Sequence, residues 1–238
     1  MEAFERTIQL IGEDAFMRLQ NARVILFGVG GVGGWAAEAL VRSGVGHLTV
    51  VDFDTVQESN LNRQLVATAD CIGEPKVEAM RRRLLQVIPA ADVRTVTCEY
   101  GEQTYGGFDF TQYDLVIDAI DNVTSKVRLI YEATKAGIPL LSSMGAGRKL
   151  DATQVRCSEF RKVEGCPLAR AIRSKMKSTG LYEQRKFLCV WSSEQARSED
   201  GGRITKGTVA PVVGVFGMML AGLALQTLQK QTTNYMFN

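Results

Sequence analysis

The chain has 238 residues, of which 45% are hydrophobic and 23% are charged, and its formal net charge is +2. These values are typical of a soluble globular protein and exclude a polycationic chain. The five cysteines form no C-x-x-C pair, which argues against a structural zinc site. An odd number of cysteines fits a reducing compartment, so we expect a cytoplasmic protein. The length of the chain is that of one large domain, which we expect over 1–238.

The first expected elements form a βαβ unit. The segment 4–19 has the pattern of an amphipathic helix, and the apolar run at 24–27 indicates a buried parallel strand. A glycine-rich turn follows, then a helix over 33–43 and a second strand over 47–51. This order is typical of a nucleotide-binding unit.

The turn of this unit matches the pattern G-x-G-x-x-G through Gly28, Gly30 and Gly33. The first glycine permits a tight turn, the second lets backbone N–H groups approach a phosphate, and the third lets the helix pack on the strand. The helix then directs its positive N-terminal end toward the anion. Asp52 follows at the usual spacing of an acid that binds ribose. This stretch by itself leaves ATP, NAD and FAD open.

The remaining elements alternate between helix and strand. In chain order we expect a loop over 55–75, a basic helix over 76–87, strands over 93–98 and 115–120, a helix over 125–135 and a strand over 139–142. Such alternation predicts an α/β fold, a Rossmann-like doubly wound and mostly parallel sheet with helices on both faces.

Two later segments depart from this rhythm. The stretch 154–203 is polar and basic, and we interpret it as an inserted lid or docking element within the single domain. From 207 to 229 there is no charged residue, which approaches the roughly 20 residues of a transmembrane helix. Because Pro211 and several glycines interrupt it, we favour a buried core helix. Peripheral or single-pass membrane association through 207–229 is the alternative.

Candidate ligands for phosphate and metal follow the expected strands. Arg63 offers a planar fork for phosphate oxygens and Lys76 a mobile charge. Asp121 lies at the carboxyl edge of the sheet, where ligands of such folds bind and where a carboxylate holds Mg²⁺ on phosphate oxygens. Together these groups suit nucleotidyl transfer from ATP. The expected nucleotide-binding residues are Gly28, Gly30, Gly31, Gly33, Asp52, Asp54, Asn60, Arg63, Gln64, Lys76, Asp121 and Asn122.

These motifs also resemble a known family. The segments DFDTVQESNLNRQ and GEPKVEAM and the pair Asp121–Asn122 are similar to ubiquitin-activating-enzyme-like adenylyltransferases, which activate carboxylates as acyl-adenylates. The opening FERTIQLIG resembles the family's N-terminal helix, whose arginine reaches into the partner subunit's ATP site. The resemblance implies ATP and a homodimer, and a monovalent cation (Na⁺ or K⁺) is left open. Mg²⁺ is expected on Asp121 from its position, and no zinc is expected because the C-x-x-C pairs are missing. The resemblance also implies the catalytic residues Arg6, Arg63, Lys76 and Asp121.

The later segments resemble the branch of this family that dehydrates threonylcarbamoyladenosine in tRNA. The motifs are DATQ and CPLA within 145–180, and CVWSSE at 189–194. The resemblance implies that the threonine carboxylate is adenylated beside the anticodon, and that the carbamoyl group then closes onto it and expels AMP. Eight basic residues in 161–186 form a candidate patch for tRNA phosphates. No DNA partner is expected, and a sulfur-mobilising partner protein is left open.

Three other functions stay open. An activator of a sulfur-carrier or ubiquitin-like protein would share the adenylation step, but the missing zinc cysteines and the basic insert argue against it. An NAD-dependent dehydrogenase would leave NLNRQ, Lys76 and Asp121 unexplained. A nucleotide-binding scaffold without activity is the third.

The cysteines and the single histidine are weaker candidates. Cys166 and Cys189 lie where the wider superfamily often places a thioester-forming thiol. Cys189 sits in an apolar stretch typical of a buried strand, and a reactive thiol needs exposure and a lowered pKa. We therefore expect no cysteine catalysis, and we expect His47 to be structural.

Overall fold

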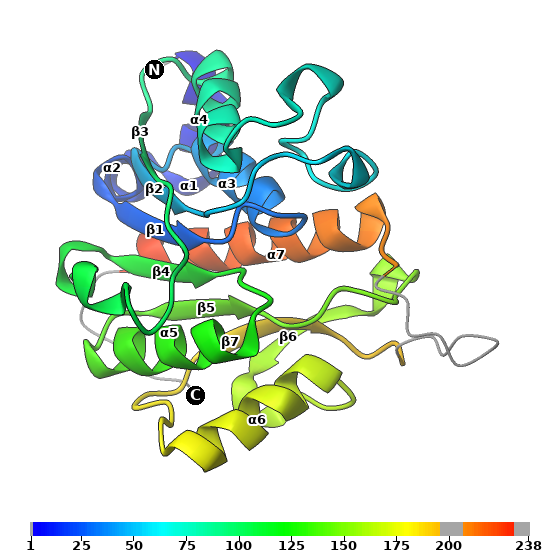
Figure 1. Cartoon of the computed structure of the whole chain (residues 1–238). Coiled ribbons are helices and arrows are strands. Elements are labelled where there is room, and N and C mark those ends of the chain that lie inside the picture. Colours follow the sequence, from blue (N-terminus) through cyan, green and yellow to red (C-terminus); the bar gives the residue numbers. More distant parts are fainter. Residues whose placement is uncertain (1, 196–206, 231–238) are drawn as a thin grey trace.

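A seven-stranded sheet forms the centre of the protein. The structure is a computed structural model, and it describes residues 2–195 and 207–230. The order of the sheet is β3-β2-β1-β4-β5-β7-β6 (Figure 1), and every neighbouring pair is parallel except β6 with β7. The strands are β1 Arg23–Phe27, β2 His47–Val51, β3 Asp92–Val96, β4 Leu115–Asp118, β5 Leu140–Ser143, β6 Val155–Glu159 and β7 Leu188–Ser192. The expected Rossmann-like, mostly parallel sheet is confirmed.

Helices cover both faces of this sheet, as the sequence predicts (Figure 1). Alternate residues of β1 show the two layers, because Val24 and Leu26 enter one hydrophobic core while Ile25 and Phe27 enter the other. The first core includes α3, α4 and α7, with α2 packed against α7, and the second includes α5 and α6. The helices are α1 Glu5–Ile11, α2 Glu13–Asn21, α3 Gly33–Arg42, α4 Lys76–Val87, α5 Val123–Lys135, α6 Pro167–Thr179 and α7 Ala210–Gln229.

Several expected elements differ in their bounds. The strand expected over 93–98 is β3 Asp92–Val96, and the helix expected over 125–135 begins at Val123. The helix expected over 4–19 is divided into α1 and α2 at Gly12, whose φ of 82° lies in the left-handed region and ends a right-handed helix. The strand expected over 115–120 ends at Asp118, because the Asp118 carboxylate accepts a hydrogen bond from the N–H of Ile120 and begins a turn.

The segment 154–203 contributes to the sheet over its described part. β7 pairs with β5, β6 closes the edge of the sheet, and α6 packs against α5. The end of the segment, from 196 to 203, lies outside the described residues. The role of the segment as a lid or docking element stays a prediction.

The uncharged segment near the C-terminus forms α7. By length and composition it is the one helix among the described residues that could cross a membrane. It packs against α3, and Phe216 and Leu220 are fully buried in the core. Gly217 allows the close approach, because a Cβ atom there would lie 2.6 Å from both the Val32 carbonyl oxygen and Trp35 Cβ. This packing fits the expected core helix and accounts for its apolar composition.

The contact between α3 and α7 gives a matched pair of glycine substitutions. Gly217→Ala is expected to lower the free energy of unfolding by about 1–3 kcal/mol, because the added methyl group must displace backbone atoms of α3. Gly222→Ala in the same helix, where nothing lies within 4 Å of the new atom, should instead raise it by about 0.5–1 kcal/mol. Urea unfolding of both variants measures the difference. Equal effects would show that the helices do not meet at Gly217.

Candidate active site

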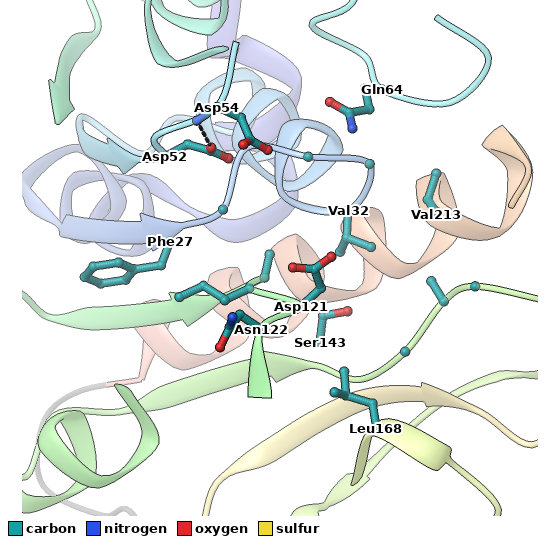
Figure 2. A pocket seen from close by; sticks show the side chains of 18 of the residues that line it. Phe27, Val32, Asp52, Asp54, Gln64, Asp121, Asn122, Ser143, Leu168 and Val213 are labelled. Atoms are coloured by element: carbon teal, nitrogen blue, oxygen red, sulfur yellow. Dashed lines mark hydrogen bonds between the residues drawn. The ribbon is translucent and has the colours of Figure 1, made fainter. Parts of the chain in front are cut away.

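A cavity of about 720 Å³ opens at the carboxyl ends of the central strands. Figure 2 shows side chains from the ends of β1 and β2, the β4–α5 turn and the N-terminal parts of α6 and α7 converging on it. All of the expected nucleotide-binding residues line it except Gly33, which lies at the start of α3. The structure therefore brings the predicted residues together at the carboxyl edge, where ligands of parallel sheets bind.

The glycine turn has the geometry that close packing requires. Gly28 has a φ of 90°, and a Cβ atom on it would lie 2.7 Å from the Ala119 carbonyl oxygen at the end of β4. A Cβ on Gly33 would lie 1.8 Å from the Gly28 carbonyl oxygen. Both positions therefore exclude side chains. The turn leads directly into the N-terminus of α3, whose unpaired N–H groups favour an anion.

Asp52 ties this turn to the end of β2. One carboxylate oxygen accepts a hydrogen bond of 2.6 Å from the N–H of Val29, and the other accepts one of 2.9 Å from the N–H of Asp54. Burial raises the pKa of Asp52, although these two hydrogen bonds and nearby Lys76 act in the opposite direction. Each oxygen retains a lone pair, so the carboxylate can also accept hydrogen bonds from ribose hydroxyl groups.

Lys76 is held close to the cavity. It is the first residue of α4 and is only 5% exposed, and its Nζ lies 2.7 Å from Asp54 Oδ2. Asp54 is half-exposed, so the pair combines a buried cation with an accessible carboxylate. A lysine held in this way presents its charge to a phosphate in a fixed position.

Asn60, Arg63 and Gln64 also line the cavity, and the part that they form with the glycine turn, Asp52 and Lys76 is called its expected nucleotide end. Arg63 donates hydrogen bonds to the Ser59 carbonyl oxygen at 2.7 Å and to Asn62 Oδ1 at 2.9 Å. Asn60 is buried, and its Oδ1 accepts a hydrogen bond from the N–H of Gln57. The Oε1 atom of Gln64 is buried without a hydrogen-bond partner among the described residues. Such an orphaned polar atom beside a cavity suits a ligand with a donor group.

Asp121 and Asn122 lie on the β4–α5 turn, near the centre of the view in Figure 2. Asn122 caps α5, since its Oδ1 accepts hydrogen bonds from the N–H groups of Thr124 and Ser125. The Asp121 side chain is exposed and makes no hydrogen bond or ion pair within the part of the chain that the structure describes. No group of three or more potential metal ligands is found there either. A single free carboxylate fits Mg²⁺, which is often held by one carboxylate together with substrate phosphates.

A buried ion pair supports this turn, and sequence reasoning missed it. Lys126 Nζ lies 2.8 Å from Asp118 Oδ2, and both side chains are fully buried. The same Nζ donates to the Ile120 carbonyl oxygen at 2.8 Å, one residue before Asp121. Ser142 donates a further hydrogen bond of 2.8 Å to Asp118. The available signal was a lysine within the apolar stripe of the expected helix, where a charge needs a partner.

The second end of the cavity was also missed as a ligand site. It is formed by the loop after β5, the start of α6 and the residues leading into α7, with Arg148 and Lys149 as its charged members. Lys149 is buried, and its Nζ donates to the carbonyl oxygens of Ser192 and Glu194. Burial lowers the pKa of Lys149. The signal available in the sequence was the pair of adjacent cations Arg148 and Lys149, which closely follow the expected strand over 139–142.

The remaining candidates lie apart from this chemistry. Arg6 is exposed on α1 and does not line the cavity of its own chain. Cys189 is fully buried in β7, and burial raises its pKa well above the usual value, which opposes thiolate chemistry. Cys166 is also buried, directly before α6. His47 lies at the opposite end of β2 from the cavity, where its Nδ1 is 2.9 Å from Asp92 Oδ2.

Comparison with known proteins identifies relatives over nearly the whole chain. The model of the ThiF family matches residues 4–238. The tRNA threonylcarbamoyladenosine dehydratase of Bacillus subtilis is 36% identical over 233 residues, which cover 94% of this chain and 92% of that protein. The molybdopterin-synthase adenylyltransferase of Escherichia coli is 30% identical, with 88% of this chain and 74% of that protein covered.

Solved structures agree with this result. The crystal structure of Escherichia coli tRNA N6-threonylcarbamoyladenosine dehydratase in complex with AMP superposes with a TM-score of 0.89 at 34% identity, covering 95% of this chain and 94% of that one. The complex of the same enzyme with ATP gives a TM-score of 0.86 at 33% identity, with 95% and 93% covered.

Proposed function

Because the chain belongs to the ThiF family, we propose that it is an ATP-dependent enzyme that dehydrates threonylcarbamoyladenosine in tRNA. The observation that carries this proposal is the cavity at the carboxyl edge, in which a glycine turn, an acid for ribose and cations for phosphate meet. The solved relatives with ATP and AMP support a nucleotide at this position. The full-length similarity to dehydratases supports the substrate.

The reaction proceeds in two steps on this proposal. The threonine carboxylate attacks the α-phosphate of ATP, forming an acyl-adenylate and releasing pyrophosphate. The carbamoyl group of the same modification then attacks the activated carbonyl carbon and expels AMP, so that the RNA loses one water in total. Because the second nucleophile is already tethered to the first product, proximity replaces a carrier or a thiol.

The residues that line the cavity have different roles in the first step. The glycine turn and the N-terminus of α3 bind phosphate oxygens, and Asp52 accepts hydrogen bonds from the ribose. Lys76 and Arg63 offset the charge that develops on the phosphates. Asp121 would hold Mg²⁺, which neutralises phosphate oxygens when bound. A monovalent cation stays a prediction.

Mass spectrometry of the RNA tests the function. The purified protein is incubated with ATP, Mg²⁺ and tRNA that carries the linear modification, and the nucleosides are then analysed. The loss of one water that depends on ATP is the expected result. An unchanged mass, together with pyrophosphate exchange only when a small carrier protein is added, would favour the carrier-activating alternative. Activity of the purified protein alone would also show that no sulfur-mobilising partner is required.

On this proposal the tRNA binds to the basic surface around α6, which is formed by the eight basic residues in 161–186. Half of the eight basic residues are occupied within the fold: Arg161 pairs with Glu183, Lys186 approaches Glu159, and Arg173 and Arg185 donate to backbone carbonyl oxygens. The other four have no ion pair or side-chain hydrogen bond among the described residues, and they are Lys162, Arg170, Lys175 and Lys177. Free cations of this kind bind RNA phosphates by releasing counterions.

A homodimer completes the site on this proposal. Exposed apolar side chains on neighbouring helices offer a surface for a second copy, with Leu10 on α1, Met17 on α2 and Met218 on α7. Since Arg6 does not line its own cavity, it is available to the cavity of the partner subunit. An arginine supplied in this way stabilises the charge of phosphoryl transfer.

Mixed dimers test the trans arginine. Arg6→Ala and Asp121→Ala subunits should each be inactive alone, because every site then lacks one of the two groups. Random mixing of the two should restore about a quarter of the wild-type activity, since half of the dimers then contain one intact site. Dehydration assays before and after mixing measure this recovery. If mixing restores nothing, Arg6 does not act across the dimer.

The expected cytoplasmic location stays a proposal as well. It is consistent with a tRNA substrate and with the packing of α7 against α3.

A further inference from the structure

The two ends of the cavity differ in charge. The acids that line the cavity lie outside its second end, and they are Asp52, Asp54, Glu99 and Asp121. The lining residues of the second end include Arg148 and Lys149 and no acid. A cationic end without a lining acid is complementary to a negatively charged group.

Arg148 has no partner for its charge in the part of the chain that the structure describes. Its guanidinium makes no ion pair, hydrogen bond or aromatic contact among residues 2–195 and 207–230. Neighbouring Lys149, by contrast, is bonded to two carbonyl oxygens, and the Glu194 carboxylate accepts hydrogen bonds from the N–H groups of Leu150 and Asp151. Arg148 also lies close enough to lower the pKa of Lys149. The charge of Arg148 is therefore the one at this end that remains available to a ligand.

The backbone holds Arg148 in a conformation that its side chain does not favour. Its φ of 62° makes it the one residue other than glycine with a positive φ in the described part of the chain. Its N–H donates a hydrogen bond of 2.7 Å to the Gly207 carbonyl oxygen, which fixes this geometry. An arginine in the left-handed region costs stability that glycine would not. Strain of this kind occurs preferentially at ligand-binding sites.

A second unpaired group lies beside it. Thr208 follows Gly207 and lines the same cavity, and its Oγ1 is buried without a hydrogen-bond partner among the described residues. Its carbonyl oxygen accepts a hydrogen bond of 3.0 Å from Asn62 Nδ2, so Thr208 lies between Arg148 and the loop that carries Arg63. A buried hydroxyl without a partner is costly unless a ligand or water supplies one. The backbones of Arg148 and Thr208 lie close together, since the Arg148 N–H is bonded to the Gly207 carbonyl oxygen, and both side chains line the same cavity.

We propose that Arg148 and Thr208 bind an oxyanion of the RNA substrate at the second end of the cavity. This oxyanion is either the carboxylate of the threonyl group or a backbone phosphate beside the modified base. The proposal rests on the function given above and adds to it the residues that position the RNA. Arg148 donates charge-assisted hydrogen bonds to the oxyanion, and Thr208 donates one from its hydroxyl group.

The variant Arg148→Gly separates binding from folding. It removes the guanidinium and also relieves the backbone strain, so its melting temperature should rise by about 2–4 °C. The KM for modified tRNA should rise about 10–100-fold, the loss expected for one charge-assisted contact, while the KM for ATP stays unchanged. Arg148→Lys should recover part of the affinity, and Thr208→Val should raise the KM for RNA by a smaller factor. Arg94→Ala, on edge strand β3, serves as the control and should change neither KM.

The substrate used in the assay identifies the oxyanion. If Arg148→Gly also raises the KM for the free modified nucleoside, the ligand is the carboxylate; if only tRNA is affected, it is a phosphate. If Arg148→Gly leaves the KM for RNA unchanged, or raises the KM for ATP by an equal factor, the proposal for Arg148 is wrong. The proposed function is not affected by this result as long as the wild-type protein is active. Wild-type protein without ATP-dependent dehydration would overturn both.

Discussion

Replacing Lys126 by methionine is expected to lower the free energy of unfolding by about 3–5 kcal/mol. Lys126 and Asp118 form an ion pair of 2.8 Å, and neither side chain is exposed. Methionine has a similar volume, so the loss reports the charge and not a cavity. It leaves the Asp118 carboxylate buried without its cation, and only two neutral donors, the Ser142 hydroxyl and the Ile120 N–H, remain in compensation.

Urea unfolding with two comparison variants measures this effect. Lys135→Met, on the exposed side of the same helix α5, should change the unfolding free energy by less than about 0.5 kcal/mol. Adding Asp118→Asn to Lys126→Met should recover part of the loss, because the uncompensated charge is then gone. A cost below about 1 kcal/mol for Lys126→Met would mean that the pair does not stabilise the fold.

The same pair has a consequence for the site. Lys126 also holds the Ile120 carbonyl oxygen, one residue before Asp121. Loss of this hydrogen bond releases the turn on which the proposed metal ligand lies. The rate at which the Lys126→Met variant dehydrates the RNA should therefore fall even under conditions in which the variant remains folded, because Asp121 is no longer fixed.

Lys76→Ala should reduce the rate of dehydration by about 10²–10³-fold, the effect of removing one preorganised group that stabilises transition-state charge. Lys76 is nearly buried at the start of α4 and is held by Asp54 at 2.7 Å. Its charge is therefore fixed at the cavity, beside the position that we propose for the phosphates, before the reaction begins. Lys76→Arg keeps the charge but not the point geometry, so it should restore only part of the rate.

Single-turnover kinetics with saturating ATP and tRNA isolates this effect from binding. Arg81→Ala is the matched control, since Arg81 is an exposed cation on the same helix that donates to the Val93 carbonyl oxygen. It should leave the rate within about twofold. If both variants lose the same activity, Lys76 acts through the stability of α4 and not on the phosphates, and the melting temperatures would then fall together.

Local patterns of the sequence predicted much of the nucleotide end. Gly28 and Gly33 were identified because the turn leaves no room for a side chain, a requirement that depends on a few neighbouring residues. The strand over 47–51 and the helix over 76–87 were predicted with the bounds that the structure shows. Hydrophobic runs and helix starts depend on neighbouring residues only, and they can therefore be recognised from the sequence alone.

Other features could not be predicted in this way. The second end of the cavity combines the loop after β5 with α6 and the start of α7, segments that are distant along the chain. The strain at Arg148 depends on a hydrogen bond to Gly207, which only the fold brings near. The relation of Arg6 to a site depends on a second subunit, which no single chain contains.

The sequence by itself determined the class of fold, the nucleotide turn and the acids and cations that face it, because spacing within one βαβ unit fixes these groups. Only the tertiary structure decided that Lys126 neutralises Asp118 beneath the site. It also decided that Arg148 and Thr208, whose side chains have no partner among the described residues, line the same cavity. Burial and pairing of charges are set by contacts between distant segments. They therefore depend on how the sheet and its two helical layers assemble, which no short stretch of sequence contains.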